Sequence, residues 1–324
     1  MKKTALIIGI IIVGIASFIV ISRIKKQTPA YAYTVGILQT ASHPALDAAR
    51  EGFMEELQHT MGDTIAFVIQ NAQGSVAQAH AIAQQFHANK QLTGFFVIAT
   101  PAAQAMSAVE KERPIFIAAV TDPQALGLLN PTTNVCGTKD MIDIKAEIEM
   151  LTQLIPHAKT IGLLYTSGET NSVALVKQMR AELETAGLTV LDFAVSNEAD
   201  MAAMVELACR KSDVILTPTD NTVASSISLI VSMAHTYKKP LIVSDNMLVT
   251  FGALAARGID YKESGKQAGR IAYKVLREGK KPYELPIEQA TSEQIFINKK
   301  TVASLGLSIP QILQKHVILV EDKQ

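Results

Sequence analysis

The chain has 324 residues, 48% of them hydrophobic, and its 30 Lys and Arg balance its 30 Asp and Glu, so it carries no formal net charge. This length is enough for one large or two medium domains, each with its own hydrophobic core. The zero net charge argues against nucleic acid as a partner. Its two cysteines, Cys136 and Cys209, form no CxxC pair and join no His/Cys cluster, which argues against a zinc or redox site. We therefore expect no metal and no cofactor.

The first predicted element is an apolar segment at the N-terminus. Residues 4–22 are uncharged and rich in Ile, with two lysines before them and a basic cluster at 23–26 after them. A run of roughly 18 apolar residues can cross a bilayer as a helix. A cleaved signal peptide is the alternative, because residues 30–32 read Ala-Tyr-Ala, but this site lies far downstream. We expect residues 1–32 to be a linker and an anchor in the cell (inner) membrane. If the segment is cleaved, the protein is secreted or periplasmic; either way the remaining chain is extracytoplasmic.

After this segment the chain consists of two similar halves. Short apolar runs alternate with amphipathic stretches, which is typical of βα units on a parallel sheet. The segment TVGILQTASHPALDAAREGFMEEL from Thr34 aligns with TIGLLYTSGETNSVALVKQMRAEL from Thr160. RPIFIAAVTDP aligns with KPLIVSDN at the same spacing, and VIATPAAQAMSAV aligns with VILTPTDNTVASS at a slightly shorter one. Three matches in the same order predict an internal duplication.

The apolar runs predict four strands in each half. In the first half they are 34–39, 65–69, 94–98 and 114–119. In the second half they are 160–165, 188–193, 213–217 and 240–244. Helices fill the gaps, and Ser75, Asn171 and Ser172 are expected at helix N-caps. The sequence therefore predicts an α/β protein of two similar doubly wound parallel-sheet lobes with a ligand cleft between them.

Clusters of short polar residues follow the predicted strands. In open α/β sheets, ligands bind beyond the carboxyl ends of the strands, and two lobes whose strand ends face one another form a closing clamp. The predicted ligand-binding residues of the first half are Gln39, His43, Pro44, Thr100, Thr121 and Asp122. Those of the second half are Ser167, Glu169, Asn171, Ser172, Thr219, Asp220, Asn221, Ser244 and Asp245.

The chemistry of this set favours a zwitterion. Hydroxyls, carboxamides and helix N-terminal N–H groups can hold a carboxylate without a cation, and acidic side chains can accept hydrogen bonds from an ammonium group. An α-amino acid fits this balance better than a sugar phosphate or a metal. We predict that Thr219 and Ser172 lie near the ligand carboxylate, and that Asp245 or Asp220 lies near its amine.

Each of these residues also has a purely structural interpretation. The segment 219–221 would serve equally well as the N-cap of the helix that follows it, and Asp122 would make a turn. Tyr165 and Phe251, close to strand ends, would form walls for an aromatic ligand or pack in a core. These alternatives stay open at the level of the sequence.

Several stretches together resemble the substrate-binding components of ABC importers, which have the periplasmic-binding-protein type I fold. They are VGILQTASHPALDAAREGF, AVTDP, NVCGT, IGLLYTSGETNS, LTPTDNTVAS and FGALAARGIDYKESGKQAG, and they span roughly residues 34–270. More narrowly, the chain is similar to tryptophan- and aromatic-amino-acid-binding proteins of TrpX type. Many members of that family carry a lipobox cysteine near the N-terminus, and this chain departs from that pattern.

The resemblance implies an organisation and a function. Lobe one is expected to hold residues 33–155 and 258–282, and lobe two residues 156–257 and 283–324, with three crossovers. The lobes would close on a small ligand, an aromatic amino acid such as tryptophan or phenylalanine being favoured. The closed form would dock on an ABC permease that is driven by a separate ATPase. We expect a monomer and no enzymatic activity.

Three rival functions follow from the same scaffold. An enzyme is argued against by the absence of GxSxG, GxxxxGK[ST], GxGxxG and HExxH motifs, although fold alone does not fix function. A ligand-sensing ectodomain would need a separate signalling partner, because we expect no effector region before the membrane segment. A repressor would need an N-terminal helix-turn-helix where this chain is apolar. The two cysteines fall in different predicted lobes, so no disulfide is expected between them.

Overall fold

The computed structural model describes residues 31–290, 294–314 and 317–322. The expected anchor at residues 4–22 lies outside these ranges. Among the helices that are described, none combines the length and the apolar character needed to cross a bilayer. Residues 33–324 form one compact unit, which contains both sheets described below.

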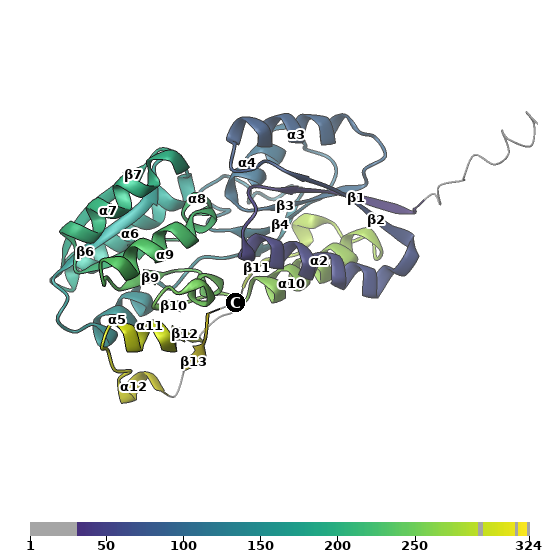
Figure 1. The fold of residues 1–324 in the computed structure, drawn as a ribbon. Helices are drawn as coiled ribbons and strands as arrows, with labels where there is room; N and C mark the ends of the chain where they lie inside the picture. The colour runs from purple at the N-terminus through teal and green to yellow at the C-terminus, as the bar shows by residue number, and fades with distance from the viewer. Residues whose placement is uncertain (1–30, 291–293, 315–316, 323–324) are drawn as a thin grey trace, which may run out of the picture. The chain divides into compact units, whose positions relative to one another are not determined.

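The first sheet has six strands in the order β11-β5-β4-β3-β1-β2, and neighbouring strands pair in parallel (Figure 1). The strands are β1 (Tyr33–Gln39), β2 (Ile65–Asn71), β3 (Gly94–Ile98), β4 (Ile115–Val120), β5 (Val135–Lys139) and β11 (Ile287–Gln289). Every residue of β3 and β4 is buried. Such continuous apolar strands are typical of the centre of a parallel sheet with both faces covered.

The second sheet has seven strands in the order β13-β12-β10-β9-β8-β6-β7. They are β6 (Thr160–Thr166), β7 (Thr189–Val195), β8 (Val214–Thr217), β9 (Leu241–Val243), β10 (Ala255–Arg257), β12 (Ile295–Asn298) and β13 (Val317–Val320). Only the β10–β12 pair among those described is antiparallel. The order β10-β9-β8-β6-β7 repeats β5-β4-β3-β1-β2 of the first sheet, which confirms the predicted duplication. All eight predicted strands are present, with ends shifted by at most two residues.

Helices cover both faces of each sheet. In the first lobe, α2 (Pro44–Met61) and α10 (Tyr261–Leu276) pack on one face, and α3 (Val76–Ala88) and α4 (Thr100–Val109) on the other. In the second lobe, α5 (Ile144–Leu154) and α6 (Thr170–Thr185) pack on one face, and α7 (Met201–Lys211), α8 (Asn221–Ser225) and α9 (Ile227–Thr236) on the other. The shorter helices are α11 (Lys299–Ser304), α12 (Gln311–Gln314), η1 (Gly62–Thr64), η2 (Glu198–Asp200), η3 (Asn246–Phe251) and η4 (Pro282–Glu284).

The helix caps agree with the sequence at one position and differ at another. Ser75 caps α3, because its hydroxyl accepts the Gln78 N–H at 3.2 Å. Asn171 and Ser172 were predicted to be N-caps, and this prediction is wrong. The helix begins at Thr170 with Glu169 in the N-cap position, and the Asn171 and Ser172 side chains bond to the loop after β8 instead.

Helices α2 and α10 are in unusually close contact. A Cβ atom on Gly265 would lie 2.0 Å from the Ala49 carbonyl oxygen, and one on Gly52 would lie 2.1 Å from the Lys262 carbonyl oxygen. Only glycine allows the two backbones to approach this closely. The contact matters for the site, because the N-terminal ends of both helices reach the same cavity between the lobes.

Two elements lie outside the lobes that the sequence assigned to them. Helix α5 packs in the core of the second lobe, with Leu151 and Leu163 in one cluster, so the first lobe does not extend to residue 155. Strand β11 pairs with β5 in the first sheet, so the segment from 283 does not all belong to the second lobe. The chain passes between the sheets after β5, after β10 and after β11. The short strands β5 and β11 were not predicted, and the boundaries moved because of them.

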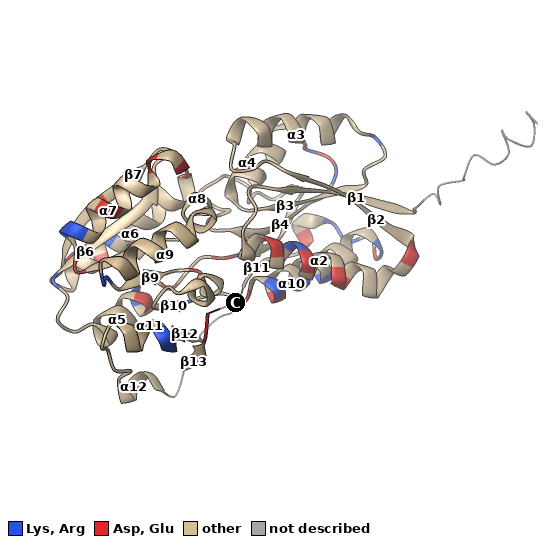
Figure 2. Ribbon diagram, in the orientation of Figure 1, with Lys and Arg blue, Asp and Glu red and all other residues tan. Residues whose placement is uncertain are grey.

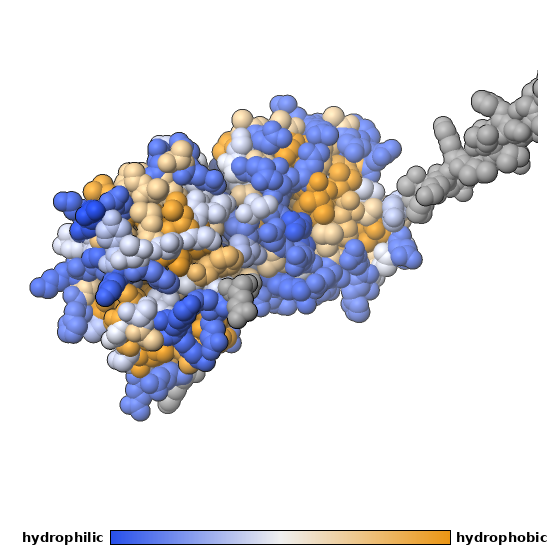
Figure 3. Space-filling model, in the orientation of Figure 1, coloured by the Kyte–Doolittle hydropathy of each residue, from blue (hydrophilic) through white to orange (hydrophobic). Residues whose placement is uncertain are grey.

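The surface of the described chain is mixed in charge and mostly hydrophilic. Basic and acidic residues are interspersed over the helices of both lobes (Figure 2). Figure 3 shows a largely hydrophilic face with separate apolar patches, one of them near β2, where the side chains of Val68 and Ile69 are exposed. Cys136 and Cys209 are both buried, in the cores of different lobes.

Candidate functional site

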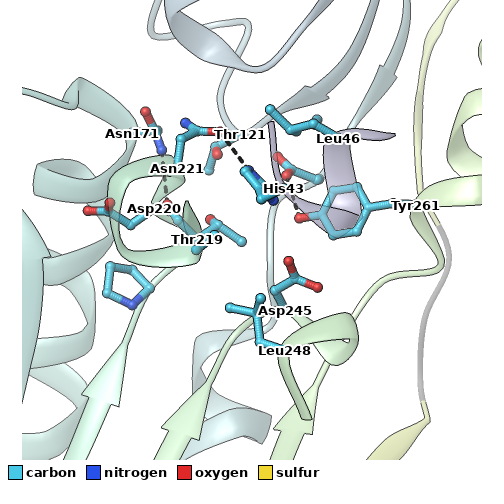
Figure 4. A pocket seen from close by; sticks show the side chains of 14 residues that line it. His43, Leu46, Thr121, Asn171, Thr219, Asp220, Asn221, Asp245, Leu248 and Tyr261 are labelled. Carbon is cyan, nitrogen blue, oxygen red and sulfur yellow. Dashed lines mark hydrogen bonds between the residues drawn. The ribbon is translucent and has the colours of Figure 1, made fainter. Parts of the chain in front are cut away.

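A cavity lies where the carboxyl ends of the strands of the two sheets meet (Figure 4). It is lined by His43, Leu46, Ala119, Thr121, Asp140, Asn171, Pro218, Thr219, Asp220, Asn221, Ala224, Asp245, Leu248 and Tyr261. The space between the lining atoms is about 380 Å³, but only about 20 Å³ of it accepts the centre of a water-sized sphere. The lining side chains therefore stand close together, and a larger molecule enters only if they or the lobes move apart.

The structure brings together about half of the predicted site residues. The ones that line the cavity are His43, Thr121, Asn171, Thr219, Asp220, Asn221 and Asp245. The ones that do not are Gln39, Pro44, Thr100, Asp122, Ser167, Glu169, Ser172 and Ser244. Several of the second group have structural partners: Gln39 bonds Ala41, Asp47 and Arg50, and the Ser244 hydroxyl lies within hydrogen-bond distance of Glu147 and of the Thr217 carbonyl.

Asp220 is fully engaged by its own lobe. One carboxylate oxygen accepts the Thr166 N–H at 2.6 Å and the Ser172 hydroxyl at 2.7 Å. The other accepts the Thr166 hydroxyl at 2.8 Å and the Val223 N–H at 2.9 Å, which makes Asp220 the N-cap of α8. A carboxylate offers about four acceptor positions, so this one has little left for a ligand. Asp220 and Ser172 therefore fit the structural interpretation better than the predicted contacts with amine and carboxylate.

Replacement of Asp220 by alanine is expected to lower the free energy of unfolding by about 2–3 kcal/mol, because the buried donors of Thr166 and Ser172 lose their acceptor. Urea denaturation in the absence of ligand measures this. The control is Asp122→Ala, whose partly exposed side chain accepts only the Ala125 N–H among the bonds described and should cost well under 1 kcal/mol by comparison. Equal stability of the two variants would contradict the structural role.

Glu169 organises a chain of hydrogen bonds that reaches across the lobes. It accepts the Asn221 side-chain amide at 2.6 Å and the Thr222 N–H and hydroxyl, each at 2.9 Å. Burial and the nearby Asp220 together raise the pKa of Glu169 to about 7, although the hydrogen bonds from Asn221 and Thr222 lower it. Glu169 thus holds Asn221 in place and does not itself face the cavity.

His43 of the first lobe meets Asn221 of the second. The two atoms His43 Nε2 and Asn221 Oδ1 are 3.3 Å apart, and Figure 4 shows the contact as a dashed line. Because the Asn221 amide donates to Glu169, its oxygen must be the acceptor, which assigns the proton of neutral His43 to Nε2. Burial lowers the pKa of His43, in agreement with a neutral ring. Its Nδ1 is left as a buried acceptor without a partner among the described residues.

Two carboxyl groups lie close to the crossovers between the lobes. Asp140, directly after β5, accepts the Tyr261 hydroxyl at 2.9 Å with one oxygen, and its other oxygen is buried without a partner in the described structure. Asp245, directly after Ser244, accepts the Met247 N–H at 2.9 Å. Burial, with a smaller contribution from Asp140, raises the pKa of Asp245 to about 7. Burial also raises the pKa of Asp140.

The unsatisfied polar atoms of this cavity are mainly acceptors. Buried atoms without a partner in the described structure include His43 Nδ1, Asp140 Oδ1, Asn171 Oδ1 and the Thr219 hydroxyl, and all four residues line the cavity. Buried polar groups are normally hydrogen-bonded, so such a cluster marks a place that is completed by another molecule. Three acceptors and an ionisable Asp245, with no Lys or Arg among the lining residues, suit a ligand that carries several N–H donors and a positive charge.

Backbone strain occurs at the same strand ends. Ala99, after β3, has φ 76°, and Ala119, in β4 and lining the cavity, has φ 56°. Non-glycine residues rarely adopt these values, and they persist where the surrounding structure holds them, often at binding sites. The pairing of β4 with β5 shifts between Ile117 and Val120, so the strain at Ala119 belongs to an irregularity at the end of β4.

Sequence reasoning missed some lining residues, above all Asp140 and Tyr261. Both come from crossovers, where Asp140 follows the unassigned strand β5 and Tyr261 begins α10. The polar ending of VCGTKD, like those of the other strands, could have indicated Asp140. The remaining missed residues, Leu46, Ala119 and Leu248 among them, are apolar and carry no signal that separates them from core residues.

This duplicated α/β fold, with a cavity lined from both lobes at the strand ends, defines a two-lobed solute-binding protein. Residues 34–319 match the family model described as "ABC transporter substrate binding protein". The chain therefore belongs to the ABC transporter substrate-binding protein family, whose members bind substrates and are not enzymes.

Named relatives of similar size support this membership. The chain is 34% identical to a tyrosine-binding protein of Clostridioides difficile (strain R20291) over 290 residues, which are 87% of this chain and 84% of the relative. It is similar to the crystal structure of an ABC domain in complex with L-Trp from Streptococcus pneumonia, with a TM-score of 0.83, 34% identity, and coverage of 88% of this chain and 99% of that one. It is also similar to the ligand-free, open structure of CD0873 from Clostridium difficile, with a TM-score of 0.67, 33% identity, and coverage of 90% and 100%.

Proposed function

We propose that this protein binds an aromatic amino acid between its lobes and delivers it to an ABC importer. The observation that carries the proposal is the acceptor-rich cavity, where Asp140 and Asp245 are buried together without a lining Lys or Arg. An α-ammonium group brings three N–H donors and the positive charge that would balance these two carboxyl groups. The named relatives, which bind tyrosine and tryptophan, support an aromatic side chain.

The ligand's two charged ends would be held by different parts of the cavity. Asp245 and the free oxygen of Asp140 would accept the ammonium N–H groups. The buried hydroxyl of Thr219, which has no partner in the described structure, would donate to the carboxylate. Asn171 would accept the remaining N–H group, because its amide nitrogen already donates to the Thr219 carbonyl at 2.9 Å.

Binding would work by closure of the lobes. His43 and Asn221 already contact each other across the cleft, and the cavity is narrow in this conformation. At nearly equal sequence identity, the chain is more similar to the L-Trp complex than to the ligand-free open structure, with TM-scores of 0.83 and 0.67. A ligand that touches both lobes would shift the equilibrium toward the closed form by its higher affinity for that form.

The cellular role follows from the family. The closed, monomeric protein would dock on a membrane permease with a separate ATPase, outside the cytoplasm. The segment at residues 4–22, outside the described residues, would hold it at the membrane or be removed as a signal. The basis for this part is the sequence pattern of the N-terminus and family membership.

A thermal-shift panel with the twenty amino acids, nucleosides and common sugars tests the proposal. A ligand at 100 times its Kd should add about 2.7 kcal/mol to the free energy of unfolding, which is a clear rise in Tm. We expect stabilisation by tyrosine, tryptophan or phenylalanine and by no sugar or nucleoside. Stabilisation by a non-amino-acid alone, or by no compound in the panel, would overturn the proposal.

A further inference from the structure

A second cavity adjoins the first on one side of the cleft. It is lined by Thr100, Gln104, Thr121, Asp122, Ala125, Leu126, Met141, Thr170, Asn171, Ala174, Leu175 and Gln178. Its open space is about 680 Å³, of which about 280 Å³ accepts the centre of a water-sized sphere, against about 20 Å³ in the first cavity. The second cavity therefore has much more open space than the first.

The two cavities are neighbours with walls in common. Thr121, at the end of β4, and Asn171, in the first turn of α6, line both of them. Thr121 belongs to the first lobe and Asn171 to the second, so the second cavity also lies between the lobes. A ligand whose charged groups occupy the first cavity can extend past these two residues into the second.

Seven of the twelve residues that line the second cavity are polar and five are apolar, but the surface they expose to the cavity is mainly apolar. Leu126 and Leu175 come from opposite lobes, and Met141 comes from the crossover after β5. Leucine and methionine side chains form favourable contacts with aromatic rings. The Thr100 hydroxyl is buried without a partner in the described structure, and Gln104 lies one turn further along α4. This end of the wall can bind a polar group on a ring.

A third cavity, which shares Asn221 with the first, is the alternative location for a ligand side chain. It is larger, with about 1220 Å³ of open space. Its lining is mostly polar and includes Ser42, Gln73, Ser75, Asn197, Glu198 and Ser225. A buried ring in such a site would leave polar groups without water or partners, which is costly. The second cavity therefore suits an aromatic side chain better.

We propose that the second cavity is the side-chain subsite of this protein, and that Gln104 makes it select rings that carry a hydrogen-bonding group, such as phenol or indole, over phenyl. This rests on the proposed binding of an aromatic amino acid. The ring lies between Leu126 and Met141 on one side and the start of α6 on the other. Thr100 and Gln104 face the phenolic hydroxyl or the indole N–H.

Filling each cavity in turn tests the location of the ring. Ala174 in the second cavity and Ala199 in the third are both exposed alanines, so Ala174→Phe and Ala199→Phe are matched variants that should fold. Isothermal titration with L-tyrosine, L-tryptophan and L-phenylalanine gives the Kd values. We expect Ala174→Phe to raise the Kd of the amino acids that bind by about 10- to 100-fold, while Ala199→Phe stays within about twofold. The opposite pattern would overturn the subsite.

Replacement of Gln104 by leucine tests the selection. In wild type, tyrosine should bind more tightly than phenylalanine, and Gln104→Leu should reduce that ratio about five- to tenfold while phenylalanine keeps its Kd. An unchanged ratio would overturn the role of Gln104. If the wild-type protein binds none of the three amino acids, the proposed function itself fails. If it binds them and both filled variants bind as tightly, only the subsite fails.

Discussion

Replacement of Asp245 by asparagine should raise the Kd for the amino-acid ligand at least about 100-fold, because it removes one of the two carboxyl groups that hold the buried ammonium group. The side chain is almost fully buried, at 5% exposure, so water cannot take over its role. Asparagine keeps the shape and can still accept the Met247 N–H that Asp245 now accepts at 2.9 Å. The loss should therefore appear in binding and not in folding, and isothermal titration together with a thermal melt separates the two.

Asp143→Asn is the matched control. Asp143 is also an aspartate at a helix N-cap, where it accepts the Ala146 N–H at 3.0 Å, but it is exposed and does not line the cavity. Its replacement should leave the Kd within about twofold. Wild-type affinity in Asp245→Asn would refute an ammonium site at this carboxyl group and would favour Asp140 as the group that binds the ammonium.

The fold could be predicted because its pattern is local. The central strands of parallel sheets are buried on both faces, so β3 and β4 read as short continuous apolar runs, and the duplication then supplied the topology. The short strands β5 and β11 gave weaker signals, and without them the lobe boundaries at 155 and 283 were misplaced. Tertiary pairing, and not local pattern, decides where such elements belong.

The site could be predicted only as a region. The rule that ligands bind at strand ends found His43, Thr219 and Asp245, because position along a strand is visible in the sequence. The direction of each side chain is not visible. Ser172 points to Asp220 instead of the cavity because the first turn of α6 packs against the loop after β8.

The site residues that come from the crossovers could not be predicted from the spacing of residues in the sequence. Tyr261 reaches Asp140 from the start of α10, more than a hundred residues further along the chain. Its position depends on the packing of α10 against α2, where Gly52 and Gly265 let the two backbones touch. Contacts of this kind form only in the folded lobes, so a local pattern of residues does not predict them.

The affinity of this site should depend steeply on pH. Burial, with a smaller contribution from Asp140, raises the pKa of Asp245 to about 7 in the free protein. The ligand's ammonium group favours the ionised carboxylate, so binding below pH 7 must release a proton. The Kd should be constant above about pH 7 and rise about tenfold per pH unit below it, which makes binding at pH 5 about 100-fold weaker than at pH 8.

The stability of the free protein should change in the opposite direction. The folded-state pKa of Asp245 lies above its unfolded value of 3.8, so its contribution to stability is fully present below pH 3.8 and is lost as pH rises through about 7. The stabilisation by ligand is therefore largest above about pH 7, where this carboxyl group no longer contributes to the stability of the free protein. Burial lowers the pKa of His43, which displaces the titration of this ring toward lower pH.

Titration calorimetry from pH 5 to pH 8, in buffers of different ionisation enthalpy, measures both the Kd and the number of protons released. Asp245 should release one proton near pH 5 and close to none at pH 8. In Asp245→Asn the residual binding should lose most of this dependence, since the group that titrates has been removed. A wild-type Kd that stays flat across this range would mean that Asp245 remains ionised in the free protein, and that the burial of two neighbouring carboxyl groups does not govern this site.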